Sequence, residues 1–226
     1  MIATIVFDLD GTLVDSATDL AAAASELIEG YGGPPLDVST VIPMVGDGAP
    51  VLVQRALTHA GLDPATPGAL DRFLQIYDRR LLEHTAPYEG MVEVLARLVH
   101  VGRLSVLTNK PGRATEAILE QLGLRGFFSE VIGGDGPYAR KPNPEGLGAL
   151  LAGTSGVGVM IGDSPADFNT AVAASCPFVV AAYGFGVAKF GPRLPACAGV
   201  ARHPRDLATV VETLTLDAAR MPIVMR

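Results

Sequence analysis

The chain has few cysteines and little positive charge. Its 226 residues include two cysteines, Cys176 and Cys197, which have neither the spacing of a metal site nor the number of a disulfide framework. Seventeen basic and 24 acidic residues give a net charge of −7, so the basic surface expected of a protein that binds nucleic acid or an anionic membrane is missing. We therefore expect a cytoplasmic protein with reduced thiols that binds neither nucleic acid nor membrane.

Long continuous hydrophobic runs are also lacking. The longest uncharged stretch lies between Asp167 and Lys189, and Pro177 and Gly184 interrupt it. A membrane-spanning helix needs about 20 predominantly apolar residues in one continuous helix, so two buried elements joined by a turn are the better interpretation. No basic segment precedes the apolar residues 5–7, so we expect no signal peptide. A hydrophobic content of 49% and a mean hydropathy of +0.34 exclude intrinsic disorder.

Six short apolar runs are predicted strands. They are nearly continuous rather than alternating, which is typical of a parallel sheet covered on both faces. Helical patterns separate most of them, and this alternation predicts a doubly wound, Rossmann-like α/β core. The predicted strands are Ala3–Asp8, Arg103–Thr108, Glu130–Gly133, Val157–Gly162, Phe178–Ala182 and Gly199–Ala201.

One long segment breaks this alternation. Residues 16–85 contain no convincing strand, and their apolar residues recur at helical spacing, first between Leu20 and Tyr31. We therefore expect an all-helical insertion over residues 16–85. The α/β core would be discontinuous, built from residues 1–15 and 86–226.

Two carboxylates follow the first predicted strand. Residues i and i+2 of an extended chain point to the same side, so Asp8 and Asp10 would place two negative charges together. This is unfavourable unless a cation or a proton lies between them, and Gly11 suits a turn with positive φ directly afterwards. We interpret the pair as a nucleophile or metal ligand beside an acid–base group. A polar turn that only ends a strand is the alternative.

The next strand ends carry a hydroxyl and a cation. Thr108 and Asn109 precede Pro111, which suits the first position of a helix whose N-terminus could bind an anion. Lys141 lies ahead of Pro144, placed to open another helix, and a lysine held there could act as a point charge on a phosphate. Simple helix capping and a solvated turn lysine are the alternatives.

The fourth strand ends in two further carboxylates. Ser164 as N-cap, Pro165 at the first helical position and Asp167 at the third make a capping-box start, which explains Asp167 without any chemistry. Asp163 precedes the cap and has no such explanation. Because ligands of open α/β sheets bind at the carboxyl ends of the strands, these groups would meet at one edge. Their composition suits Mg²⁺ beside a phosphate, since Mg²⁺ takes one or two carboxylates and shares phosphate oxygens.

These motifs, in this order, resemble the haloacid dehalogenase (HAD) superfamily over essentially the whole chain. The helical insertion looks like the C1-type cap of that superfamily. The motifs that carry the resemblance are Asp8-x-Asp10-Gly11-Thr12, Thr108-Asn109, Lys141 and Gly162-Asp163-x-x-x-Asp167.

The resemblance implies a role for each motif residue. Asp8 would attack phosphorus and form an aspartyl-phosphate, while Asp10 would protonate the leaving alcohol and then activate water. Thr108 and Lys141 would bind the phosphoryl group with Asn109 beside them, and Lys141 would also restrain Asp8.

The same resemblance implies a magnesium site. Mg²⁺ would be held by the carboxylates of Asp8 and Asp163 and by the backbone carbonyl of Asp10. Asp167 would support the site.

Asp10 also separates the branches of the superfamily. Dehalogenases and phosphonatases lack an acid at this position, whereas phosphatases and phosphomutases carry it. Closer similarity favours the phosphoglycolate phosphatase branch, through Asp15-Ser16, Gly32–Leu36, Met44–Ala49 and Leu107–Pro111. Ser175 departs from the pattern, because glycine is usual there.

We therefore expect a Mg²⁺-dependent phosphatase of a small phosphate monoester, with 2-phosphoglycolate as the leading substrate. The alternatives are a sugar-phosphate phosphatase (including the N-acetylmuramate 6-phosphate type), a pyrophosphatase, a phosphomutase and a non-catalytic module of the same fold.

The insertion contains one candidate segment for recognition of the leaving group. Gly46, Asp47 and Gly48 open its second predicted helix, where their backbone could face the substrate; a simple glycine turn is equally compatible. The chain is expected to act as a monomer or a homodimer. The apolar tail over residues 216–226 would pack on the core or on a partner chain.

Overall fold

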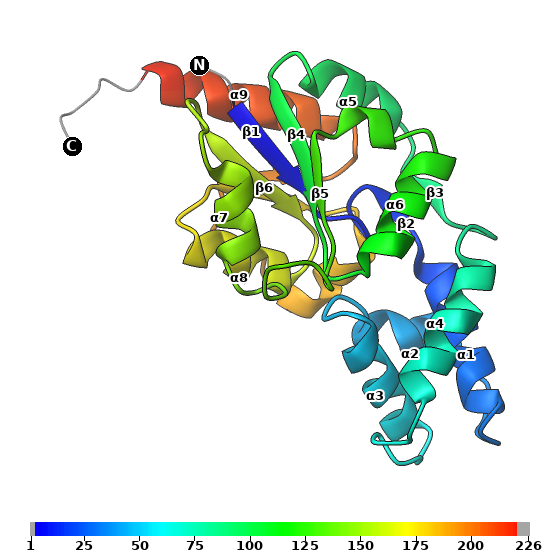
Figure 1. Cartoon of the computed structure of the whole chain (residues 1–226). Coiled ribbons are helices and arrows are strands. Elements are labelled where there is room, and N and C mark those ends of the chain that lie inside the picture. The colour runs from blue at the N-terminus through cyan, green and yellow to red at the C-terminus, as the bar shows by residue number, and fades with distance from the viewer. Residues whose placement is uncertain (1–2, 221–226) are drawn as a thin grey trace.

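The computed structural model describes residues 3–220, and a six-stranded sheet lies at its centre (Figure 1). All neighbouring strands are parallel, in the order β5-β4-β1-β6-β7-β8. The strands are β1 (Ala3–Phe7), β4 (Gly102–Leu107), β5 (Glu130–Ile132), β6 (Gly158–Gly162), β7 (Phe178–Ala181) and β8 (Gly199–Ala201). Each predicted strand is confirmed to within one residue at either end.

Helices cover both faces of this sheet, as the continuous apolar strands predicted. In β1, Ile5 and Phe7 belong to one buried apolar cluster and Val6 to another, since alternate residues of a strand face opposite sides. The first cluster includes side chains of α5 (Met91–Leu98), α6 (Gly112–Gln121) and α9 (Asp206–Arg220). The second includes side chains of α7 (Glu145–Leu151) and α8 (Pro165–Ala173). The doubly wound α/β core is confirmed.

A second body of helices lies beside the strand ends and forms the lower part of Figure 1. It consists of α1 (Ala17–Glu29), α2 (Val38–Val41), the 3-10 helix η1 (Ile42–Met44), α3 (Ala49–His59) and α4 (Ala69–Arg80). Residues 16–85, all of them described, contain no strand. We call this body the cap.

A short ribbon joins the cap to the core. β2 (Val14–Asp15) pairs antiparallel with β3 (Ala86–Pro87), so the two chain crossings lie side by side. This ribbon was not predicted from the sequence, because a two-residue strand has no periodicity to detect. The predicted cap boundaries, 16 and 85, lie directly beyond it, and the division into two domains stays a prediction.

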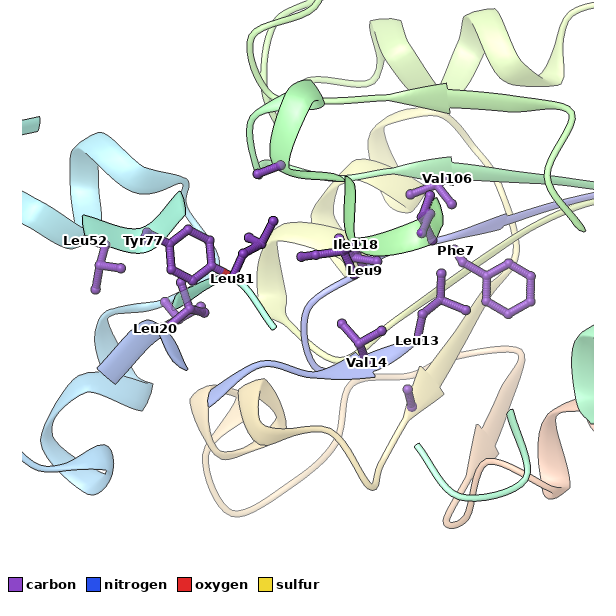
Figure 2. Close-up of a cluster of buried hydrophobic side chains, with 14 of the residues drawn as sticks. Phe7, Leu9, Leu13, Val14, Leu20, Leu52, Tyr77, Leu81, Val106 and Ile118 are labelled. Atoms are coloured by element: carbon purple, nitrogen blue, oxygen red, sulfur yellow. The ribbon is translucent and has the colours of Figure 1, made fainter. Parts of the chain in front are cut away.

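One apolar cluster runs from the sheet into the cap. Figure 2 shows Phe7, Val106 and Ile118 in the core, and Leu20 and Tyr77 in the cap. All are less than 9% exposed. Because buried apolar packing resists displacement, this cluster defines how the cap sits over the strand ends.

Three details of the helices correct or extend the sequence analysis. Pro111 and Pro144 were expected at the first helical position, but each lies one residue earlier, as the N-cap. Ser175 has a left-handed backbone, with φ of 52°. In the tail, Leu216 belongs to α9 and is 57% exposed, and residues 221–226 lie outside the described part.

The described helices do not support a membrane span. Over residues 3–220 none is both long enough and apolar enough to cross a bilayer.

Candidate active site

A cavity of about 290 Å³ lies between the core and the cap. The core lines it with Asp8, Thr108 and Asp163, which follow β1, β4 and β6. The cap lines it mainly with apolar side chains, including Leu52 and Phe73. The strand ends therefore supply the polar groups, and the cap closes the space above them.

Three buried carboxylates form a cluster at the strand ends. Asp8, Asp163 and Asp167 each offer an oxygen, and these atoms lie within 4.8 Å of one another. Their exposed fractions are 7%, 2% and 0%. Burial, followed by repulsion from Asp167, raises the pKa of Asp8 to about 7 although Lys141 opposes the shift.

The pKa of Asp163 is shifted in the same direction as that of Asp8. Burial raises its pKa well above the ordinary value, and the charges of Asp167 and Asp8 add to the shift. Packed carboxylates of this kind are stable in the charged form only with a cation among them. The donor set consists of hard oxygens, so it fits the predicted Mg²⁺.

Lys141 joins two members of the cluster. Its Nζ donates to Asp8 Oδ1 at 2.7 Å and to Asp167 Oδ1 at 2.6 Å. Burial disfavours the charged amine, but the two carboxylates outweigh burial and hold the pKa of Lys141 above its ordinary value. Lys141 is therefore a fixed positive charge beside Asp8.

Asp167 serves the helix and the site together. Its Oδ2 accepts hydrogen bonds from the Ser164 hydroxyl at 2.6 Å and from the Ser164 amide at 3.0 Å. The expected capping box at the start of α8 is thus confirmed. Its other oxygen binds Lys141, so Asp167 reaches Asp8 through the lysine.

Glycines allow the backbone to pack closely around Asp163. The amide of Gly186, in the 3-10 helix η3 (Phe185–Phe190), donates to Asp163 Oδ2 at 2.7 Å. A Cβ on Gly11 would lie 1.9 Å from the same oxygen. Gly11 also has φ of 83°, which confirms the expected turn.

Asp10 turns away from the acidic cluster. Lys110 Nζ donates to both of its carboxylate oxygens at 2.9 Å, and the Ser16 hydroxyl donates to Oδ1 at 2.5 Å. The Lys110 side chain is 3% exposed and lies 4.6 Å from the ring centroid of Tyr77, on cap helix α4. Asp10 is therefore held by the core, the start of the cap and a buried lysine.

Lys110 was missed by the sequence analysis. It directly follows Thr108 and Asn109 at a predicted strand end, close to the expected carboxylates. That position could have indicated a buried cation. The sequence does not show which carboxylate Lys110 binds, because its partner Asp10 lies 100 residues away.

Thr108 and Asn109 lie where the sequence analysis placed them. Thr108 is 3% exposed and lines the cavity, and its Oγ1 accepts a hydrogen bond from the Lys110 amide at 3.2 Å. Asn109 Nδ2 donates to the carbonyls of Gly46 and Lys141, both at 3.0 Å. The Lys141 amide donates back to Asn109 Oδ1 at 2.9 Å. Asn109 therefore braces the Lys141 loop against the cap.

The cap loop reaches the cavity at two glycines. Gly46 and Gly48 line it, with φ of 113° and 89°. The Asp47 side chain points to Arg55 on α3, at 2.6 Å. The structure thus brings the backbone of this loop to the cavity and directs its carboxylate elsewhere.

Comparison with known proteins agrees with this arrangement. The family model described as haloacid dehalogenase-like hydrolase matches residues 5–181. The chain belongs to this family. The resemblance found in the sequence is thereby confirmed for this HAD hydrolase, and so is its fold class.

The HAD hydrolase has close relatives among curated proteins. It is 42% identical over 193 residues to a phosphoglycolate phosphatase of Rhodospirillum rubrum, covering 80% of each chain. It is 40% identical over 190 residues to a phosphoglycolate phosphatase of Caulobacter vibrioides, covering 81% of this chain and 80% of that protein.

Solved structures show the same architecture. A crystal structure described as a predicted phosphoglycolate phosphatase from Haemophilus somnus has a TM-score of 0.81 and 27% identity, covering 93% of this chain and 98% of that one. A predicted phosphatase from Clostridium acetobutylicum has a TM-score of 0.79 at 21% identity, covering 94% of this chain and 99% of that one. The second likeness concerns the fold alone.

Proposed function

We propose that this HAD hydrolase is a Mg²⁺-dependent phosphatase that hydrolyses 2-phosphoglycolate through an aspartyl-phosphate on Asp8. The observation that carries the proposal is the buried cluster of Asp8, Asp163 and Asp167 with Lys141 bound into it, under a cavity that the cap closes. The names of the curated relatives support the substrate.

The proposed metal ligands are the Asp8 and Asp163 carboxylates and the backbone carbonyl of Asp10. Asp167 supports them indirectly, because both of its oxygens are bound by Lys141 and Ser164. Mg²⁺, when bound, would neutralise part of the charge of the carboxylates and the phosphate. This would let an anionic nucleophile approach an anionic substrate.

The first proposed half-reaction transfers the phosphoryl group to Asp8. An Asp8 oxygen forms a bond to phosphorus while the bond from phosphorus to the ester oxygen breaks. Protonated Asp10 gives its proton to that oxygen, which leaves as an alcohol. Thr108 and Lys141 bind the phosphoryl oxygens, and Lys141 keeps Asp8 aimed through its 2.7 Å hydrogen bond.

The second half-reaction removes the phosphoryl group with water. Asp10, now a carboxylate, takes a proton from a water molecule whose oxygen attacks phosphorus. The bond between phosphorus and Asp8 breaks, so inorganic phosphate leaves and Asp8 is restored. Lys110 and Ser16 hold Asp10 in place for both steps. A covalent intermediate divides one difficult hydrolysis into two easier steps.

The remaining expectations fit this proposal. Asn109, Gly46 and Gly48 would shape the space around the leaving group, with Asp47 holding the loop through Arg55. A monomer or a homodimer would suffice, because one chain supplies all the proposed residues. The free thiols of Cys176 and Cys197 are consistent with a cytoplasmic location.

A panel of phosphate monoesters and pyrophosphate, assayed with Mg²⁺ and with EDTA, tests the proposal. We expect Mg²⁺-dependent release of phosphate, fastest from 2-phosphoglycolate, and its loss in Asp8→Asn. The matched control is Asp71→Asn, on the exposed face of α4. No Mg²⁺-dependent release from any ester would contradict a phosphatase and favour a binding module. Isomer formation without phosphate release would indicate a phosphomutase.

A further inference from the structure

Three cationic side chains line the cavity, and they differ in their partners. Lys110 binds the Asp10 carboxylate, and Arg113 binds the carboxylate of Asp78. Among the side chains that the structure describes, over residues 3–216, no carboxylate lies within ion-pair distance of Lys189, and the charges of Asp47 and Asp163 act on it only from further away. Of these three cavity-lining cations, Lys189 is therefore the one whose described hydrogen-bond partner is a backbone carbonyl and not a carboxylate.

The ammonium of Lys189 faces the cap loop. Its Nζ donates to the Val45 carbonyl, and a Cβ on Gly46 would lie 3.3 Å from it. An ammonium has three N–H donors, so this contact leaves two for a ligand. The carboxylate of Asp47, in the same loop, binds Arg55 instead.

The environment of Lys189 makes an anionic ligand favourable. Lys189 is half-buried, and burial lowers the pKa of its amine. A partly desolvated cation gains most from a charged hydrogen-bond partner. An anion entering the cavity would supply that partner.

The position of Lys189 in η3 shows how far its side chain starts from the acidic cluster. A 3-10 helix has about three residues per turn and a rise of about 2 Å per residue, so residues 186 and 189 lie on one side, about 6 Å apart along the axis. Gly186 binds Asp163 at the strand ends, whereas Lys189 contacts the cap loop one turn further on. The phosphoryl group would lie at the acidic end, and the leaving group would extend towards Lys189.

We propose that Lys189 binds a negatively charged group on the leaving part of the substrate, so that the site selects phosphate esters whose alcohol carries a carboxylate. The inference rests on the proposed phosphatase function. 2-Phosphoglycolate has such a carboxylate one carbon from its ester oxygen. The Val45–Gly46 backbone, which Lys189 contacts, would form the adjoining wall of this subsite.

Two esters that differ mainly in this charge test the inference. 2-Phosphoglycolate carries a carboxylate where 2-hydroxyethyl phosphate carries a neutral hydroxymethyl group. We expect the wild type to prefer 2-phosphoglycolate in kcat/KM. In Lys189→Met this preference should fall about 10- to 100-fold, the range for losing a hydrogen bond to a charged group. Lys189→Arg should keep much of it, and Arg193→Met, which removes an exposed charge beyond the same helix, should keep all of it.

The outcomes separate the subsite from other roles. If Lys189 only fastens the cap through Val45, Lys189→Met lowers kcat/KM for both esters equally, and the inference is overturned. An unchanged preference in Lys189→Met, or a wild type that does not prefer the charged ester, overturns it too. If the wild type hydrolyses neither these esters nor any other phosphate monoester, the proposed function has failed rather than the subsite.

Discussion

Replacing Asp8 by asparagine should stabilise the metal-free protein at neutral and alkaline pH while it abolishes turnover. Asp8 is 7% exposed, and burial and Asp167 raise its pKa to about 7, from an ordinary value of 3.8. The folded protein therefore keeps a proton that the unfolded chain has already lost. Between these two pKa values unfolding releases a proton, so the stability of the wild type falls as pH rises.

The size of this stabilisation follows from the shift in the pKa of Asp8. A shift of about three units, at 1.36 kcal/mol per unit, corresponds to about 4 kcal/mol between acid and alkaline conditions. The asparagine side chain has no charge to bury, and its amide oxygen could still accept the hydrogen bond from Lys141, which also keeps Asp167. The variant should thus gain up to about 4 kcal/mol over the wild type at about pH 8, and little near pH 4.

Urea unfolding in EDTA, at several pH values, measures this difference. Asp71→Asn removes an exposed carboxylate from the first turn of α4, so it should lower the free energy of unfolding by at most about 1 kcal/mol and should not raise it at alkaline pH. A difference between Asp8→Asn and the wild type that stays constant from acid to alkaline pH would refute the reasoning. So would a variant that is less stable than the wild type at alkaline pH.

Three further substitutions address neighbouring features. Lys110→Met should lower kcat by about 10²-fold with a smaller change in KM, because Lys110 positions Asp10 for proton transfer and is not proposed to bind substrate. Steady-state kinetics with 2-phosphoglycolate measure both constants, and a change confined to KM would contradict the positioning role. Mg²⁺ should raise the Tm of the wild type but not that of Gly11→Ala, because the alanine Cβ would lie 1.9 Å from Asp163 Oδ2 and would force that carboxylate to move. An equal rise in Tm with Mg²⁺ in both proteins would argue against Asp163 as a ligand. Ser175→Gly should raise the free energy of unfolding by about 1 kcal/mol, because Ser175 has a left-handed backbone with φ of 52°, which glycine adopts without strain. Denaturant unfolding measures this, and a lower free energy of unfolding in the variant would contradict it.

The sequence predicts best those features that depend on short-range geometry. Asp8 lies at the end of an apolar run, and Ser164 and Asp167 are three residues apart, so local rules place each of them correctly. The two prolines missed by one position illustrate the limit of such rules. Pro111 has φ of −54° but an extended ψ of 138°, and its φ, which the ring restricts, suits either the N-cap or the first helical position.

Features formed between distant segments could not be predicted in this way. The Lys110–Asp10 pair, the β2–β3 ribbon and the contact from Lys189 to the cap loop join residues 71 to 144 positions apart. No local periodicity encodes such contacts. They depend on how the cap packs over the strand ends, which the apolar cluster through Leu20 and Ile118 determines only in the folded protein.

Detection of a covalent intermediate on Asp8 would distinguish the proposed two-step mechanism from direct hydrolysis by water. Wild-type enzyme with Mg²⁺ would be mixed with 2-phosphoglycolate radiolabelled in its phosphoryl group and quenched with acid within a single turnover. We expect the label to be attached transiently to the protein, to be released by hydroxylamine as from an acyl phosphate, and to map to the peptide that contains Asp8. Phosphate release without protein-bound label, together with turnover by Asp8→Asn, would contradict it.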